Sequence, residues 1–139
     1  MDILEVFKKK FHGKIIAAEA VGLRRVYIRI KPESLAEAVG LLIKMNTRFI
    51  TISGIDEKEY IEAIYHFSDD KNGCILSLRV ILPGKHPELS SVRSILPAAV
   101  WIESEISELI GINFGDIPAL SALFLSKDYR GRKQPLRKN

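Results

Sequence analysis

The apolar positions of this chain follow two different periods, which divide it into candidate helices and strands. In residues 2–11 the apolar side chains recur at spacings of three and four, which predicts a short amphipathic helix that Gly13 ends. Apolar and polar side chains then alternate in residues 24–31, as in a strand with one buried face. The first part of the chain therefore predicts a helix and two strands, residues 14–21 and 24–31, joined at Gly22.

The middle of the chain predicts one helix and three strands. Proline is tolerated in a first helical turn, and apolar residues at helical spacing follow it, so residues 32–46 are expected to form a helix of about four turns. The three strands are expected at residues 48–53, 60–67 and 74–82. Between the last two strands, residues 68–73 end in Asn-Gly, a pair that favours the tight turn of an antiparallel hairpin.

Two helices and an extended tail are expected in the last third. Ser90 or Ser91 can cap a short helix that runs to Ile95, and Pro97 suits the first turn of a second helix that ends at Ile110. Gly111 stands where a left-handed residue commonly ends a helix.

The order of elements predicts an α+β fold, with a mixed or antiparallel sheet of about five strands and helices mainly on one face. We expect residues 1–126 to form one domain and residues 127–139 to form an extended basic tail. The 139 residues are enough to bury a core without metal or disulfide crosslinks. Because Cys74 is the single cysteine, an internal disulfide or a Cys-x-x-Cys site is excluded, and a reducing compartment is favoured.

Charge is concentrated at one end of the chain. The formal net charge is +4, but residues 127–139 contain six basic residues and one acid, so they carry +5 and residues 1–126 carry −1. Such an arm can bind nucleic acid, an anionic membrane surface or an acidic protein groove, or it can be a solvated chain end. The uncharged apolar runs are too short to cross a bilayer, and the first residues lack the pattern of a secretory signal.

Catalytic and metal-binding patterns are scarce. His12, His66 and His86 are far apart and do not form a zinc-ligand pattern, and nucleophile and phosphate-loop motifs are absent from the sequence. A histidine such as His66 on a predicted strand is more often a strand-face residue than a ligand. Asp69 and Asp70 lie in the predicted turn, where aspartate is favoured for backbone reasons.

A helical wheel shows which sides of the predicted helix carry the acidic residues of the segment 101–110. Ile102, Ile106, Leu109 and Ile110 fall on one arc, which is wide enough to face a core. Trp101, Glu105 and Glu108 share another arc, and Glu103 lies beyond the far edge of the apolar one. Glu105 and Glu108 are close enough for a carboxylate pair or half of a dimetal site, but no histidine accompanies them in this helix. A solvated acidic face accounts for Glu103. A tryptophan between two acids instead indicates a surface that meets a partner's arginines.

These segments resemble the family of the 30 kDa subunit of respiratory complex I, the NADH:quinone oxidoreductase, a family that also occurs in energy-converting membrane-bound hydrogenases. The family pattern is a small-residue helix start, Trp-x-Glu-Arg-Glu, an acid, Gly-Ile-x-Phe, Pro-x-Leu, and a closing Asp-Trp/Tyr…Gly…Pro-Leu-Arg-Lys. The matching residues here are Pro97, Ala98, Ala99, Trp101, Glu103, Glu105, Glu108, Leu109, Gly111, Ile112, Phe114, Pro118, Leu120, Asp128, Tyr129, Gly131, Pro135, Leu136, Arg137 and Lys138.

The chain departs from the family pattern at several positions. Ser104 replaces the arginine between the two glutamates, Ile117 replaces a histidine, and Ser121 replaces a basic residue or proline. The tail has about two additional residues before Pro-Leu-Arg-Lys, and the given sequence then ends where complex I members continue. These departures favour a short relative of the hydrogenase type over an NADH:quinone enzyme.

The resemblance implies a non-catalytic peripheral subunit of a membrane-associated, ion-translocating oxidoreductase, held on the cytoplasmic side of the cell membrane through its complex. It implies that this chain binds no cofactor and that its partners are a large catalytic subunit and a small iron–sulfur subunit, which hold the nickel–iron site and the iron–sulfur clusters. Residues 101–118 are expected to dock on the large subunit and residues 127–139 to lie over it as a strap. The implied partner-binding residues are Trp101, Glu103, Glu105, Glu108, Gly111, Phe114, Pro118, Asp128, Tyr129, Arg130, Pro135, Leu136, Arg137 and Lys138.

Other interpretations stay open from the sequence. Within the family, the chain could serve an NAD(P)H or other quinone oxidoreductase. Outside it, a small RNA- or ribosome-associated protein would explain the basic tail, although residues 1–126 are nearly neutral and a basic sheet face is not expected. A carboxylate-based hydrolase has only the glutamates in its favour.

Overall fold

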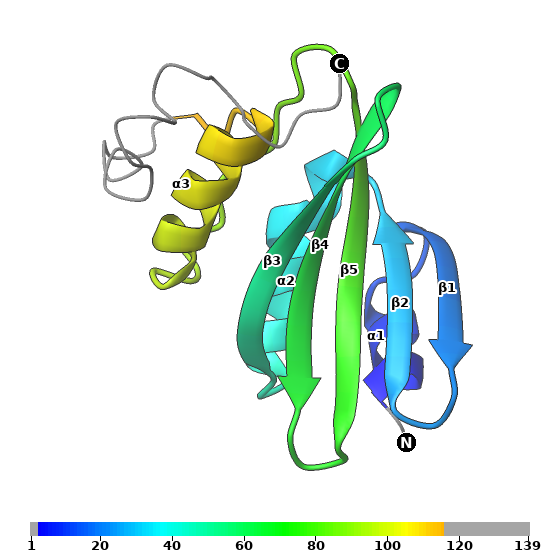
Figure 1. Cartoon of the computed structure of the whole chain (residues 1–139). Helices are drawn as coiled ribbons and strands as arrows, with labels where there is room; N and C mark the ends of the chain where they lie inside the picture. The colour runs from blue at the N-terminus through cyan, green and yellow to red at the C-terminus, as the bar shows by residue number, and fades with distance from the viewer. Residues whose placement is uncertain (1–2, 116–139) are drawn as a thin grey trace.

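The computed structural model describes residues 3–115, in which helices and strands follow the predicted order closely. Figure 1 shows their arrangement. The elements are α1 (Ile3–Lys10), β1 (Ile15–Val21), β2 (Arg25–Ile30), the 3₁₀ turn η1 (Pro32–Ser34), α2 (Leu35–Lys44), β3 (Arg48–Asp56), β4 (Tyr60–Asp69), β5 (Cys74–Pro83) and α3 (Ala99–Ile110).

The five strands form one mixed sheet in the order β1-β2-β5-β4-β3. β1 and β2 pair antiparallel, as do β3 with β4 and β4 with β5, whereas β2 and β5 are parallel. The α+β class and the mixed sheet of five strands are therefore confirmed. The tight turn between β4 and β5 is also present, and Gly73 supplies its positive φ of 65°.

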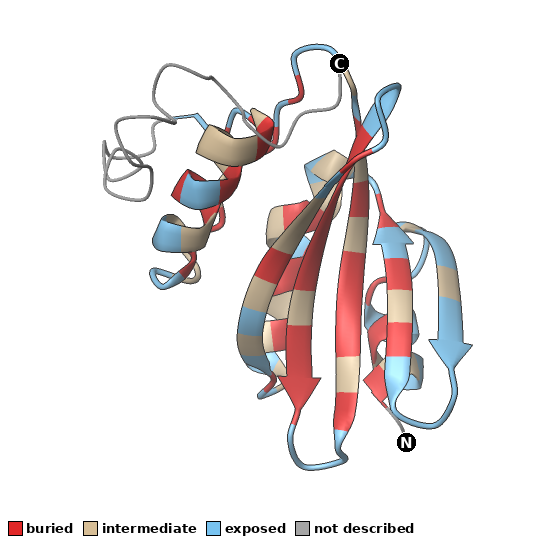
Figure 2. Cartoon of the chain, viewed as in Figure 1, coloured by how far each residue is buried: buried red, intermediate tan, exposed pale blue. Residues whose placement is uncertain are grey.

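One face of the sheet carries the core. Along β4, Ile61, Ala63, Tyr65 and Phe67 are fully buried, and they are paired with buried apolar residues of β5. The helices lie on this face: α1 and α2 are behind the sheet in Figure 1, and the near face of β2, β5 and β4 is open. The buried positions alternate along β2, as Figure 2 shows, because successive side chains point to opposite faces.

α3 packs against β3 at a glycine. A Cβ atom added to Gly54 would clash with Cδ1 of Ile110, so the missing side chain lets the helix approach the strand closely. Ile106 and Ile110 are buried at this contact. The helix ends as the sequence predicts, because Gly111 adopts a φ of 95° and its N–H bonds to the carbonyl oxygens of Ile106 and Ser107.

The short helix expected between Ser90 or Ser91 and Ile95 is absent, and α3 begins at Ala99 rather than Pro97. Only a single turn forms, in which the N–H groups of Ile95 and Leu96 bond to the carbonyl oxygen of Val92. Pro97 lacks an N–H and disfavours helical geometry in the residue before it, so this turn cannot extend into α3. The hydroxyl of Ser91 accepts a hydrogen bond from the N–H of Arg93 in this turn and also donates one to the distant carboxylate of Glu103.

Candidate partner-docking surface

Trp101, Glu105 and Glu108 lie on the side of α3 that faces away from the sheet. The indole of Trp101 is 45% exposed, Glu105 is exposed and Glu108 is half-buried. Because positions 101, 105 and 108 are four and three apart on a helix, their side chains form one continuous strip. We call these three residues the α3 surface. An exposed tryptophan beside two carboxylates offers a partner both apolar contact and acceptors for charge-assisted hydrogen bonds.

The expectation of a solvated Glu103 is wrong. This side chain is fully buried, where it accepts a hydrogen bond from the hydroxyl of Ser91 and one of 2.8 Å from the N–H of Val92. Burial raises the pKa of the Glu103 carboxyl, and the two hydrogen bonds and the charge of Arg93 oppose that rise. Glu103 therefore holds the segment before α3 against the helix and is not presented to a partner.

The wheel misplaced Glu103 because the buried side of α3 is wider than its apolar arc. The segment of residues 84–98 folds back along the helix and covers Glu103 and Ser104, both of them fully buried. The hydroxyl of Ser104 donates to the carbonyl oxygen of Val100, so it is satisfied within the helix. Ile102 and Leu109, expected in the core, are only partly buried.

A second buried polar group lies near Glu103. The phenol oxygen of Tyr65 is fully enclosed and has no hydrogen-bond partner among residues 3–115. Burial, and after it the negative charge of Glu103, raise the pKa of Tyr65 far above the ordinary phenol value. The phenol is therefore neutral at any physiological pH, and the space between β4 and α3 is polar but closed to solvent.

Two further predicted site residues have structural roles within the described residues. Phe114 is buried, and Gly111 is the half-buried residue that terminates α3. Residues 112–115 are fixed by backbone pairing with the segment after β5, because Asn113 exchanges N–H and carbonyl bonds with Pro87 and Leu89. Pro118 and the predicted tail residues Asp128, Tyr129, Arg130, Pro135, Leu136, Arg137 and Lys138 lie outside the described residues, as does the expected boundary at residue 126.

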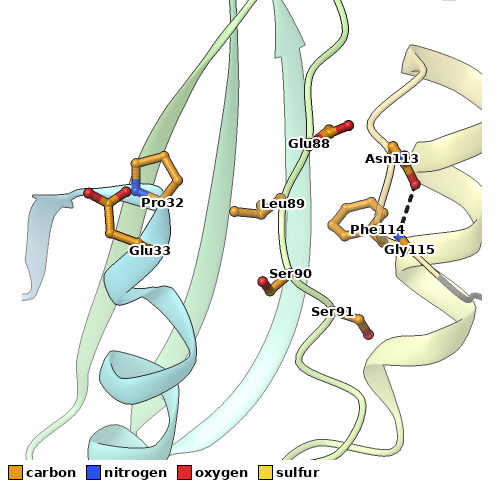
Figure 3. Close-up of a pocket in the computed structure, with 9 residues that line it drawn as sticks. All are labelled: Pro32, Glu33, Glu88, Leu89, Ser90, Ser91, Asn113, Phe114 and Gly115. Atoms are coloured by element: carbon orange, nitrogen blue, oxygen red, sulfur yellow. Dashed lines mark hydrogen bonds between the residues drawn. The ribbon is translucent and has the colours of Figure 1, made fainter.

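A cleft of about 590 Å³ lies between the start of α2, the segment after β5 and residues 113–115. Figure 3 shows its lining, in which Leu89 points toward Pro32 and Asn113 accepts a hydrogen bond from the Gly115 N–H. Its ionisable groups are the carboxylates of Glu33 and Glu88. Among residues 3–115, cations and imidazoles are missing from this lining, so these residues supply no acid–base or nucleophile–base pair of opposite character.

The three histidines remain apart in the fold. His66 lies on β4, where one ring nitrogen is 3.0 Å from the hydroxyl of Ser53 and the other is 2.8 Å from the hydroxyl of Ser77. These three residues form a polar row across β3, β4 and β5, which is a strand-face role. Within residues 3–115, groups of three or more His, Cys, Asp or Glu residues with metal-site geometry are absent. No helix in this range is both long and apolar enough to cross a membrane.

The grouping of arginines on the open sheet face was missed from the sequence. Arg25, Tyr27 and Arg29 of β2 share this face with Arg79 of β5, and Glu19 and Glu62 lie among them, so the face groups several arginines but is mixed in charge. Arg79 is paired with the buried carboxylate of Glu62. The alternation in residues 24–31 was visible, but the parallel pairing that places β5 beside β2 has no local signal.

A family model described as "Respiratory-chain NADH dehydrogenase, 30 Kd subunit" matches residues 28–139. The match spans most of the sequence, and the chain therefore belongs to that family. This confirms the resemblance carried by the Trp-x-Glu-x-Glu and Pro-Leu-Arg-Lys blocks.

Curated relatives are subunits of several oxidoreductases. A subunit of the F(420)H(2) dehydrogenase of Methanosarcina mazei is 38% identical over 91 residues, which cover 64% of this chain and 57% of that protein. The membrane-bound hydrogenase subunit beta of Pyrococcus furiosus is 28% identical over 148 residues, which cover 99% and 86%. A subunit of the NADH-quinone oxidoreductase of Streptomyces coelicolor is 30% identical over 87 residues, which cover 60% and 35%. The chain therefore spans less than two thirds of the length of the first and third of these relatives.

Two solved structures share the fold. A chain of the membrane-bound sulfane sulfur reductase, an archaeal respiratory membrane complex, superposes with a TM-score of 0.85 at 18% identity, covering 97% of this chain and 81% of that one. The trypsin-resistant fragment of Nqo5 superposes with a TM-score of 0.69 at 24% identity, covering 85% and 96%. At these identities the likeness concerns the fold.

Proposed function

We propose that this member of the 30 kDa subunit family is a peripheral, non-catalytic subunit of a membrane-associated, ion-translocating oxidoreductase of the hydrogenase type. In this role the chain docks on the large catalytic subunit and stabilises it for electron transfer. The nickel–iron site and iron–sulfur clusters belong to the partner subunits, and the chain is held at the cytoplasmic side of the membrane through the complex.

The observation that carries the docking role is the α3 surface. Trp101 remains 45% exposed in a domain whose other large aromatic side chains mostly pack inside, and Glu105 and Glu108 stand beside it. Tryptophan is enriched among the residues that dominate interface energies. Carboxylates at the edge of such an anchor select a partner with arginine or lysine. The surface therefore fits a cationic, partly apolar patch on the large subunit.

Two comparisons bear on the type of complex. The alignment with the membrane-bound hydrogenase subunit beta spans almost the whole chain and 86% of that protein, which supports a hydrogenase-type complex. A second candidate is a dehydrogenase that feeds electrons to a quinone or a related carrier. The higher identity of 38% with the F(420)H(2) dehydrogenase subunit favours it. Nickel in the purified complex would select the first candidate, and a flavin-dependent input subunit without nickel would select the second.

The tail belongs to the same proposal. Residues 127–139 carry +5 and include the Pro-Leu-Arg-Lys block, which is part of the resemblance to the family. Thirteen extended residues span roughly 40 Å, enough to cross a neighbouring subunit. We propose that they form a strap that contacts acidic groups on the large subunit. Under this proposal nucleic acid is not a partner of the tail.

Affinity purification from the source organism tests the docking role. A tagged full-length chain is expected to recover a large redox subunit and a smaller iron–sulfur subunit in mild detergent. Trp101→Ala and Glu105→Arg should each lower that recovery at least tenfold, because the first removes the anchor and the second reverses a charge beside it. Glu37→Arg is the matched control, because it changes an exposed acid on α2 and disturbs a surface ion pair with Lys14.

The outcomes separate docking from folding. Each variant chain is purified alone and its melting temperature is compared with that of the unchanged chain. Normal recovery of both subunits with Trp101→Ala and Glu105→Arg would refute docking through the α3 surface. Deleting residues 127–139 should reduce recovery while leaving the melting temperature unchanged, and normal recovery after this deletion would remove the strap. Tight, salt-sensitive binding of random RNA would favour the nucleic-acid interpretation instead.

A further inference from the structure

Several exposed apolar side chains lie on the open face of the sheet. Of the seven large apolar residues that are exposed in residues 3–115, Val21, Ile50, Ile55 and Tyr60 lie on this face, and Leu23 is fully exposed in the turn beside it. Where one face of a sheet meets only water, the side chains on that face are normally polar. Val21 and Ile50 lie toward the Arg25 end of this face, whereas Ile55 and Tyr60 lie toward its opposite end. The apolar groups near Arg25 are therefore the part of this face that best offers contact to another molecule.

Cations without acidic partners accompany these apolar groups. Arg25 and Arg29 are exposed on β2, on either side of Tyr27, and among the described residues neither has an ion pair. By contrast, Arg48 and Arg79 of the same sheet each contact a carboxylate. Arginine is the cation best suited to a buried interface pair, because its planar group binds a carboxylate through two hydrogen bonds.

A small cavity lies beside one of these arginines. It has a volume of about 210 Å³ and is lined by Arg25, Tyr27, Ile50, His66, Ile75 and Ser77. This volume is below the range of about 300–1,000 Å³ that small-molecule sites occupy, but it has room for one side chain. Contacts with the hydroxyls of Ser53 and Ser77 hold the His66 ring in place beside this cavity. Burial, and after it the charge of Arg25, lower the pKa of His66, so the imidazole is neutral near pH 7 and Arg25 supplies the formal charge.

We infer that the open face of the sheet is a second protein-docking surface, where an acidic side chain of a partner subunit inserts beside Arg25 and apolar partner residues cover Val21 and Ile50. A positive charge in a cavity whose other lining groups are apolar or neutral selects a carboxylate over a neutral or basic side chain. Nucleic acid fits this face less well, because Glu19 and Glu62 lie among the arginines and aromatic stacking groups are few.

This inference rests on the proposed role as a subunit, but it does not depend on the α3 surface. The domain would be bivalent, with an acidic surface on α3 and a basic, apolar surface on the sheet. A subunit with two such surfaces can join two neighbours or grip one large neighbour at two places.

Photocrosslinking in the intact complex locates the partner. The full-length chain carries p-benzoylphenylalanine at Ile50 in one strain and at Lys44 on α2 in a control strain, because both positions are exposed and they lie on opposite sides of the sheet. After irradiation and purification, we expect Ile50 to yield a peptide of another subunit that contains Asp or Glu, and Lys44 to yield none of that peptide. A peptide of a second copy of this chain, a peptide without an acid, a nucleic-acid adduct, or no crosslink at Ile50 would overturn the inference.

Charge exchange tests the pairing itself. Arg25→Glu should lower the yield of that partner with the tagged chain at least tenfold, and reversing the crosslinked acid to arginine should restore most of it. Lys44→Glu makes the same change in charge on the other side of the sheet and should have no effect. Each variant must keep the melting temperature of the unchanged chain within about 2 °C, which an exposed residue permits. Unchanged yield with Arg25→Glu, or failure of the exchange to rescue, would overturn the inference.

The two proposals fail separately. If the α3 variants detach the chain from its complex and Arg25→Glu does not, the proposed function stands and the second surface is refuted. If Arg25→Glu detaches the chain and the α3 variants do not, the second surface stands and docking through the α3 surface is refuted. If no variant changes recovery, both are refuted.

Discussion

Replacing Glu103 with alanine is expected to destabilise the domain by about 3 kcal/mol, because the substitution removes the two hydrogen bonds of the carboxylate. The buried carboxylate accepts from the Ser91 hydroxyl and the Val92 N–H, which joins the segment before α3 to the helix. Glu103→Gln preserves the shape and both contacts, because the amide oxygen can accept from Val92 and the amide nitrogen can donate to Ser91. The pair of variants therefore separates the hydrogen bonds from the charge.

The size of the effect follows from two opposing contributions. Each hydrogen bond to a charged group contributes about 1.5–3 kcal/mol net, and Glu103→Ala also leaves the fully buried Val92 N–H without its acceptor, at a cost of about 1–3 kcal/mol. Removing a buried charge recovers part of its desolvation cost, which holds the total near 3 kcal/mol. For a domain of this size, that loss corresponds to a fall in Tm of about 10 °C.

Urea unfolding at 25 °C, followed by circular dichroism, measures the change. Glu105→Ala is the matched control, because Glu105 is exposed two residues further along the same helix, and we expect it to change stability by less than about 0.5 kcal/mol. A loss below about 1 kcal/mol for Glu103→Ala, or equal losses for Glu103→Ala and Glu105→Ala, would refute the reasoning.

The pH dependence gives a second readout of the same residue. Because burial raises the pKa of Glu103 in the folded state, the native domain binds this proton more readily than the unfolded chain does. The stability from this group is therefore complete below the ordinary glutamate pKa of about 4.3 and is lost as pH rises through the folded value. Glu103→Gln cannot titrate, so its stability should fall less over that window. Parallel pH profiles of the two proteins would contradict the assignment.

Three further predictions concern the sheet. Gly54→Val should destabilise the domain by about 1–3 kcal/mol, because the added side chain would press on α3. Gly40→Ala, where a Cβ meets open space in α2, should instead stabilise the domain by about 0.5–1 kcal/mol. Equal effects of the two substitutions in urea unfolding would argue against the close approach of α3 to β3. Arg79→Ala should lower the free energy of unfolding by about 2–4 kcal/mol, because it leaves the buried carboxylate of Glu62 unpaired. The double variant Glu62→Met/Arg79→Met should recover most of that stability in thermal unfolding. If it does not, the ion pair itself stabilises the sheet. The imidazole of His66 should titrate below its usual pKa of about 6.5 in NMR spectra, so its contribution to stability is lost as pH falls through that range; a normal or raised value would contradict its burial beside an arginine.

Most of the fold could be predicted from local patterns. The strands were found because β2 alternates and β4 and β5 are separated by an Asn-Gly turn, and α3 was found because Gly111 ends a helical period. The helix expected before Pro97 does not form although Ser91 accepts the Arg93 N–H as a cap would, because Pro97 stops the turn and Glu103 holds Ser91 and Val92 against α3. Capping preference is local, and the contact between Ser91 and Glu103 is not.

The candidate site was predicted less completely. Trp101 and Glu105 are exposed as the wheel requires, but a wheel treats every acid off the apolar arc as solvated. Glu103 is buried because the segment after β5 returns over the helix, which only the tertiary fold shows. The arginines of the open face were visible one by one. Their grouping depends on β5 lying beside β2, and those strands are far apart in sequence.

The parallel pairing of β2 and β5 also has a consequence for how the chain reaches its native state. Arg25 of β2 is paired with Ile75 of β5, so the contact closes a loop of about 50 residues at an entropic cost of about 3.5 kcal/mol. The meander of β3, β4 and β5 can form from neighbouring segments, whereas β1 and β2 can join the sheet only after β5 is complete. During synthesis, the inner edge of β2 must therefore wait unpaired until residue 79 has left the ribosome, and in this interval a chaperone would protect the chain most.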